Sequence, residues 1–175
     1  FNPGDKESDF DPSLDMFYRL TPSLNAALTV NTDFSAADVD NRQVNLTRFN
    51  LFFPERRDFF LNDADLFQFG NISNIGSSNQ AGSRGARENA RPYFSRNIGI
   101  GSNGEEVDIK YGGRVSGRVG RWNIGTLAVR QDASSTVDAS DLFVGRFSAN
   151  VLDESTLGFI VTDGDAQSNV DNTVY

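Results

Sequence analysis

The main pattern in this chain is an alternation of apolar and polar residues with a period of two. Between residues 107 and 119 it would place the two classes on opposite faces, with Val107, Ile109, Tyr111, Val115 and Val119 against Asp108, Lys110, Arg114, Ser116 and Arg118. Side chains of a β-strand point to opposite faces in turn, so this spacing predicts strands. Similar patterns predict strands near residues 14–20, 24–34, 107–119, 122–131, 142–151 and 156–162, and Thr173 to Tyr175 resembles the start of another. No segment has a convincing helical repeat, so we expect an all-β fold.

The links between these predicted strands alternate in length. Tight turns are expected at residues 20–24, 119–123 and 152–156, and long polar links at 1–13, 34–106, 131–141 and 163–172. Barrels of the bacterial outer membrane have short turns at one end and longer loops at the other. Strands of about nine to eleven residues also match the length that crosses a bilayer with tilt.

Two architectures explain the alternation. In an up-and-down transmembrane β-barrel of antiparallel strands, the apolar residues face lipid and the polar residues face the interior. In a soluble β-sandwich, the apolar face packs on a core and the polar face meets water. The alternating link lengths and the row that contains Arg114 and Arg118 favour the barrel. Since a membrane barrel needs about eight strands or more, residues 1–175 would then be an incomplete slice of a single barrel domain.

A block rich in phenylalanine lies within the expected long loop, residues 35–106. Residues 41–70 hold seven of the 15 phenylalanines, around a charged turn. This block either docks a partner or narrows the barrel mouth or lumen, or it only packs against the barrel, and packing is the usual role of apolar clusters. The residues that would dock a partner are Phe52, Phe53, Arg56, Arg57, Phe59 and Phe60.

The composition excludes several functions. The formal net charge is −8, and the chain has no histidine and no cysteine. It therefore lacks the positive surface that nucleic-acid binding needs, a histidine-based catalytic triad, and the ligands of a structural zinc site. No run of apolar residues is long enough to predict a transmembrane helix. Glu105 and Glu106 are adjacent, which places them on opposite faces of a strand, and we expect no enzyme activity.

Charged residues suggest two further kinds of site. A basic row would line a barrel lumen, where it would either favour anionic solutes or pair with Asp15, Asp33 and Asp108 in a closed interior; its members are Arg19, Lys110, Arg114, Arg118 and Arg146. Calcium is a weaker alternative to ordinary acidic loops, because oxygen ligands alternate in two stretches but the full EF-hand spacing is missing. The candidate calcium ligands are Asp63, Asp65, Asp163 and Asp165.

Four ordered blocks resemble the outer-membrane barrel region of a large bacterial family of unknown function, of the domain of unknown function 5916 type. The blocks are LTPSLNAALTVNTDFS, QVNLTRFNLFFPERRDFFLNDADLFQFG, RPYFSRNIGI and GGRVSGRVGRWNIGTLAV. Members of that family resemble a family-nine carbohydrate-binding domain at the N-terminus, followed by a TonB-receptor-like barrel. The carbohydrate-binding part is absent from this chain, and the resemblance implies no catalytic residue.

These observations together predict a non-enzymatic protein of the bacterial outer membrane, in the Gram-negative cell envelope. Its role would be the passage of a solute, or a structural or attachment role in a surface assembly. Its partners would be outer-membrane lipid or lipopolysaccharide and other envelope proteins. The alternative is a soluble extracellular β-sandwich that binds carbohydrate or protein.

Overall fold

The fold is all-β and consists of one antiparallel sheet with seven strands in sequence order. The computed structural model describes residues 12–32, 55–69, 92–101, 105–152, 155–170 and 172–175. Each strand pairs with the next one along the chain, and within the described residues the sheet does not close on itself. The strands are β1 (Leu14–Thr21), β2 (Leu24–Thr32), β3 (Ile109–Val119), β4 (Trp122–Gln131), β5 (Ser140–Leu152), β6 (Ser155–Asp163) and β7 (Thr173–Val174).

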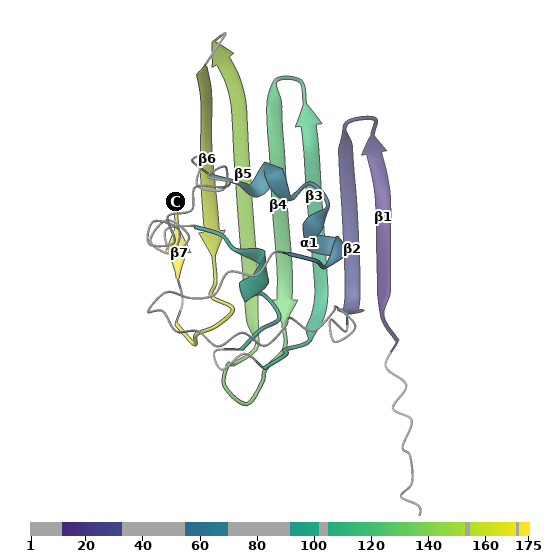
Figure 1. Ribbon diagram of the computed structural model, residues 1–175, viewed down its shortest axis with the longest axis vertical. Helices are drawn as coiled ribbons and strands as arrows, with labels where there is room; N and C mark the ends of the chain where they lie inside the picture. Colours follow the sequence, from purple (N-terminus) through teal and green to yellow (C-terminus); the bar gives the residue numbers. More distant parts are fainter. Residues whose placement is uncertain (1–11, 33–54, 70–91, 102–104, 153–154, 171) are drawn as a thin grey trace, which may run out of the picture.

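The tight turns lie at one end of the sheet and the long links lie at the other (Figure 1). The turn between β3 and β4 uses Gly120, whose φ of 60° lies in the left-handed region that glycine adopts without strain. Next to it, Gly117 lets the β1–β2 turn approach β3, because a Cβ there would lie 2.1 Å from the carbonyl oxygen of Ser23. The Arg118 amide donates a hydrogen bond of 2.7 Å to that same oxygen.

The sheet has two unlike faces, which we call the covered face and the open face. On β3, Arg114 and Ser116 are buried on the covered face, whereas Tyr111 and Val119 are exposed on the open face. The register extends this division across the sheet. One row of the open face consists of Tyr18, Ala26, Val115, Thr126, Gly145 and Val161.

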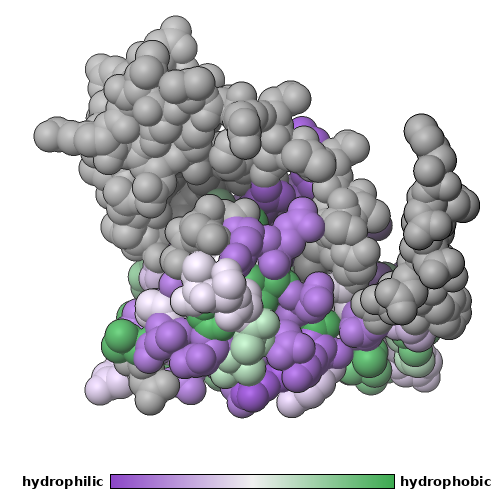
Figure 2. All heavy atoms as spheres, turned by 90° about the horizontal axis from the view of Figure 1, so that it is seen from below, coloured by the Kyte–Doolittle hydropathy of each residue, from purple (hydrophilic) through white to green (hydrophobic). Residues whose placement is uncertain are grey.

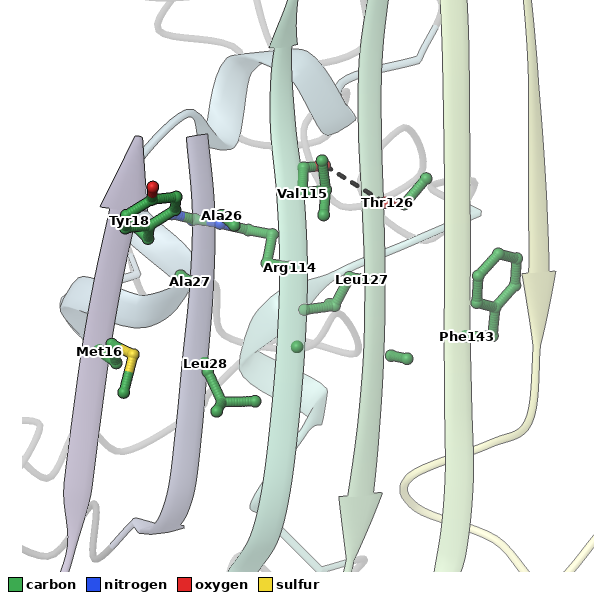
Figure 3. A pocket seen from close by; sticks show the side chains of 12 residues that line it. Met16, Tyr18, Ala26, Ala27, Leu28, Arg114, Val115, Thr126, Leu127 and Phe143 are labelled. Atoms are coloured by element: carbon green, nitrogen blue, oxygen red, sulfur yellow. Dashed lines mark hydrogen bonds between the residues drawn. The ribbon is translucent and has the colours of Figure 1, made fainter. Parts of the chain in front are cut away.

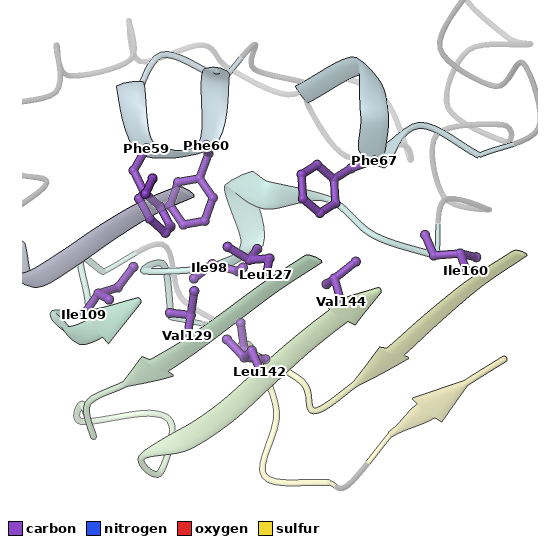
Figure 4. Packing of buried hydrophobic residues seen from close by; sticks show 12 residues of the cluster. Phe59, Phe60, Phe67, Ile98, Ile109, Leu127, Val129, Leu142, Val144 and Ile160 are labelled. Carbon is purple, nitrogen blue, oxygen red and sulfur yellow. The ribbon is translucent and has the colours of Figure 1, made fainter. Parts of the chain in front are cut away.

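Three short helices lie across the covered face: α1 (Asp58–Leu61), η1 (Ala64–Phe67) and η2 (Ser95–Asn97). Their apolar side chains meet those of the sheet in one core (Figure 4). Its members are Ala27, Phe59, Phe60, Phe67, Ile98, Ile109, Leu127, Val129, Leu142, Val144, Ile160 and Ala166, with Tyr93 packed against them. The core therefore lies between the sheet and the helices, on one side of the sheet.

One expectation about facing is wrong. The alternation places Ile109 on the same face as Tyr111, but Ile109 is fully buried in the core and Tyr111 is 55% exposed. The register of β3 against β4 shifts between these two residues, and such a bulge reverses the direction of the following side chains. On the neighbouring strand, Asn31 has a left-handed φ of 50° near the same level.

No helix among the described residues combines the length and the apolar character that a membrane-spanning helix requires.

Candidate functional site

The candidate site is the contact between the covered face and the segment Glu55–Phe69, which we call the Phe segment. Phe59 and Phe60 of α1 pack edge to face with ring centroids 5.0 Å apart, and both are buried. Glycines of the sheet make room for two of the rings. A Cβ at Gly112 would lie 3.1 Å from the Phe59 ring, and one at Gly125 would lie 3.2 Å from the Phe67 ring. Two glycines of the covered face therefore make room for two phenylalanines of the Phe segment.

A buried ion pair fixes the start of the Phe segment. The Arg57 guanidinium donates to both carboxylate oxygens of Glu55 at 2.9 Å and lies 4.3 Å from the centre of the Phe60 ring. It also donates to the carbonyl oxygens of Ser95 at 2.7 Å and Ile98 at 2.6 Å. Since charge-assisted hydrogen bonds are the strong kind, Arg57 joins the Phe segment to the segment around η2.

The pKa of Glu55 reflects this arrangement. Burial alone would raise the pKa of the Glu55 carboxyl group, but the hydrogen bonds and the positive charge of Arg57, helped by Ser95, hold it below its ordinary value of 4.5. Burial and the negative charge of Glu55 raise the pKa of the nearby Tyr93 hydroxyl. Glu55 is therefore an ionised buried acceptor at neutral pH, and the Tyr93 hydroxyl stays protonated. The Tyr93 ring packs against Phe67 with centroids 5.6 Å apart.

Two arginines of the sheet bind the backbone of the Phe segment. Arg114 donates to the carbonyl oxygen of Phe59 at 2.7 Å and to that of Asn62, and its guanidinium lies 5.7 Å from the centre of the Phe59 ring. Arg146 donates to the carbonyl oxygen of Gln68 at 3.1 Å and lies 5.2 Å from the centre of the Phe69 ring. These two members of the predicted lumen row therefore contact the Phe segment directly.

The other three members of that row have different surroundings. Lys110 forms an exposed ion pair of 3.0 Å with Asp132. Arg118 donates to the side chain of Asn123 at 3.0 Å. Arg19 is exposed on the edge strand β1. The structure therefore brings Arg114 and Arg146 into one site and does not bring Lys110, Arg118 or Arg19 into it.

The predicted docking residues divide in a similar way. Arg57, Phe59 and Phe60 are buried in the contact with the sheet, and Arg56 is exposed beside them. Phe52 and Phe53 lie outside the described residues. Within the described part of the block, the phenylalanine pair turns towards the protein interior.

The four candidate calcium ligands do not come together. Asp63 accepts hydrogen bonds from Ser116 at 2.7 Å and from Asn25 at 3.4 Å, so its carboxylate contacts the covered face, whereas Asp65 is exposed. Asp163 and Asp165 line a polar pocket of about 570 Å³ near β7 and accept hydrogen bonds from Thr173 and Ser168. The residues that the structure describes contain no group of three or more acidic side chains arranged to hold a metal ion.

The open face presents large apolar side chains to its surroundings. Exposed members include Leu14, Met16, Tyr18, Leu20, Leu28, Val30, Tyr111, Val119, Trp122, Phe143, Leu157 and Phe159. A shallow apolar groove of about 530 Å³ lies between Met16, Tyr18 and Leu28 on one side and Phe143 on the other (Figure 3). Seen from the end with the long links, the described surface is largely hydrophilic, with hydrophobic residues both among these residues and towards its sides (Figure 2). Most of the exposed apolar side chains of the strands therefore lie on the face opposite the core.

Sequence reasoning did not identify Glu55, Tyr93 and Asp63 as a set of contacts between segments. The Glu55–Arg57 pair is local, because the two residues are two positions apart in the sequence. The carbonyl partners of Arg57 lie 38 and 41 residues further along the chain. No pattern in one sequence indicates such distant partners.

Comparison with known proteins gives one match. No curated protein and no solved structure matches this chain. Residues 2–143 match the family described as "Domain of unknown function (DUF5916)". The match covers well over half of the chain, so this protein belongs to that family of unknown function.

Proposed function

We propose that this chain forms part of the wall of a β-barrel in a bacterial outer membrane, as a non-enzymatic envelope component. The open face would contact lipid, and the covered face with its Phe segment would lie inside. The observation that carries this proposal is the position of the exposed apolar side chains of the strands, most of which lie on the face opposite the core. Exposed apolar surface that is large and continuous marks an interaction site in a soluble protein, and it is the normal outer surface of a membrane barrel.

The height of the apolar band supports a bilayer as the partner. On β3, the open-face residues run from Tyr111 to Val119, which is about 26 Å at a rise of about 3.3 Å per residue. With a tilt of about 40°, this length spans about 20 Å, close to the apolar band of about 25 Å that membrane barrels present. The strands thus have the length that this proposal needs.

The ends of the band also suit a membrane. At the turn end, Trp122 is exposed in the last paired row of β3 and β4. Phe159 is exposed one row from the middle of the sheet, where it stacks on Phe147 with centroids 5.1 Å apart. Aromatic residues are enriched at the two interfaces of membrane proteins. At the opposite end, Arg130 and Asp141 form an ion pair of 2.7 Å in the row that contains Tyr111, so charge begins where the apolar band stops.

The covered face favours a structural role over a basic pore in this part of the wall. Arg114 and Arg146 bind carbonyl oxygens and aromatic rings of the Phe segment. Their charge is therefore directed at the protein itself, and it holds the segment against the wall. Attachment within a surface assembly is the role that we favour over passage of an anionic solute.

Arginine substitutions at two depths test the proposal. Val115 lies in the middle row of the open face and Leu157 lies in the row next to the turns. In lipid vesicles, Val115→Arg should lower the free energy of unfolding by about 2–4 kcal/mol and Leu157→Arg by about 1 kcal/mol or less, because the cost depends on depth. Urea titrations of the refolded variants give both values, and a far-ultraviolet circular dichroism spectrum confirms that each variant has folded.

The soluble β-sandwich predicts a different result. In a sandwich, protein would cover the apolar face. The larger loss in the free energy of unfolding would then occur at whichever of Val115 and Leu157 is more deeply buried under that cover. Extraction of the folded wild-type chain by a salt wash, without detergent, would overturn the membrane proposal. Extraction only with detergent, together with the depth dependence, would support it.

A further inference from the structure

The Phe segment lies on the sheet without joining it through backbone hydrogen bonds. Within the residues that the structure describes, its backbone amides donate to carbonyl oxygens of the segment itself, as those of Phe60 and Leu61 do to Arg57. A strand, in contrast, shares its backbone hydrogen bonds with the neighbouring strands of the sheet. The Phe segment can therefore leave the sheet without breaking the hydrogen-bond ladder of any strand.

Three charged side chains hold the Phe segment on the sheet. Arg114 and Arg146 of the sheet donate to carbonyl oxygens of the segment. Asp63 of the segment accepts hydrogen bonds from the side chains of Ser116 and Asn25. Beside these bonds, the phenylalanine rings of the segment point into the core (Figure 4). Side-chain bonds and packing, rather than a shared ladder, thus keep the segment in place.

The contact with Arg114 is incomplete. This side chain belongs to a residue that is only 4% exposed, and its Nε is buried without a hydrogen-bond partner among the described residues. A buried donor without a partner costs free energy, and contact with water removes that cost. Ser116, on the same face, is fully buried and also has a polar side chain that water would hydrate. Burial under the Phe segment therefore has a polar cost that is absent when the segment is away from the sheet.

The segment around η2 is joined to the Phe segment. Arg57 donates to two carbonyl oxygens there, and the Tyr93 ring packs against the Phe segment. Attachment to the sheet resumes at Gly99, whose amide donates to the side chain of Gln131 at 2.9 Å. We call the Phe segment and residues 93–98 together the strap.

We propose that the strap is a releasable cover, which leaves the covered face as one unit while the sheet stays folded. Proteins open locally in cooperative units, and the free energy of such an opening is lower than that of global unfolding. Release breaks the contacts with the sheet and exposes the guanidinium group of Arg114 on the covered face. This inference does not depend on the membrane proposal, because all of its contacts lie on the covered face.

Hydrogen exchange of the wild-type chain tests the release. A helix of four residues is not stable by itself, so the amides of the strap exchange once it has left the sheet. Phe60 and Leu61 should show the same protection factor as Asn97 and Ile98, at least about 100 times lower than that of β3 and β4. Low concentrations of urea should accelerate exchange less in the strap than in these strands, because its opening exposes less surface.

Two results of this experiment would overturn the proposal. Equal protection and equal urea dependence in the strap and in β3 and β4 would mean that the strap opens only when the whole chain unfolds. Unequal protection in the two halves of the strap would mean that they do not leave together. Peptides that separate residues 55–69 from residues 92–101 allow mass spectrometry to measure both halves in one sample.

A crosslink between the strap and the sheet tests whether the strap departs or only frays in place. The chain has no cysteine, and a hydrogen bond of 2.7 Å joins Asp63 to Ser116. In the variant with Asp63→Cys and Ser116→Cys, a short bifunctional reagent would join the two thiols. Exchange at Phe60 and Leu61, relative to β4, should then be at least about tenfold slower than in the same variant with each thiol capped by iodoacetamide, because a covalent link restricts the open state. Equal exchange in the crosslinked and capped forms would overturn the proposal.

Discussion

Replacement of Arg57 by methionine tests whether a buried ion pair holds the Phe segment on the sheet. The side chains of Arg57 and Glu55 are only 4% and 9% exposed. Removal of one partner of a buried pair costs about 3–5 kcal/mol, because the other charge stays buried without compensation. Methionine keeps an apolar stem of similar length, so the lower value of about 3 kcal/mol applies.

Amide hydrogen exchange followed by mass spectrometry measures this loss where it occurs. The amides of Phe60 and Leu61 donate to the carbonyl oxygen of Arg57 at 2.9 Å, and they exchange when the segment opens. A loss of about 3 kcal/mol corresponds to exchange that is about 150 times faster. Amides of the central strands β3 and β4 should change much less.

Arg56→Met is the matched control for Arg57→Met. It removes the same type of residue one position earlier, where the side chain is exposed. Exposed ion pairs contribute about 1 kcal/mol or less, so exchange at Phe60 and Leu61 should rise by no more than about fivefold. Equal acceleration in the two variants would refute the reasoning, because burial would then have no part in the effect.

Three further outcomes follow from the same contacts. The folded pKa of Glu55 lies below 4.5, so the stability that its ionised carboxylate contributes is complete above pH 4.5 and is lost as the pH falls through the folded pKa. Protection of the Phe segment against exchange, corrected for the intrinsic rate, should therefore fall at low pH. Glu55→Gln should flatten this dependence. Gly117→Ala should lower the free energy of unfolding by more than about 2 kcal/mol, and Gly120→Ala should lower it by about 1 kcal/mol. Both glycines have a positive φ, but only at Gly117 would a Cβ meet another backbone segment. Urea titration of the two variants compares these losses. Ser116→Ala should weaken docking of the Phe segment by about 1–3 kcal/mol in hydrogen exchange, because the Asp63 carboxylate loses its shorter hydrogen bond, and no effect there would contradict a docking role for Asp63.

The strands were the most predictable part of this fold. Strand β4 has the same bounds that the sequence pattern indicated, Trp122 to Gln131, because a regular ladder follows directly from local residue types. The facing of Ile109 could not be predicted in this way. A bulge depends on how two strands fit each other, and the sequence of one strand does not contain that information.

The site was predictable in its residue types and not in its contacts. The dense phenylalanines and the arginines of the predicted lumen row were both visible in the sequence. Their meeting was not, because Arg114 reaches Phe59 across 55 positions. Among five similar basic residues, burial by the Phe segment distinguishes Arg114 from the exposed Lys110, and burial depends on the complete fold.

The central claim is that the open face contacts lipid, and the fluorescence of Trp122 tests this claim most directly. It is the single tryptophan of the chain and is 39% exposed on that face. The wild-type chain would be refolded into vesicles whose phospholipids carry bromine at defined depths of the acyl chain. We expect emission shifted to shorter wavelength than in detergent-free buffer, with the strongest quenching by bromines near the interface. Emission typical of a water-exposed indole, quenched by iodide and unaffected by brominated lipid, would contradict the account.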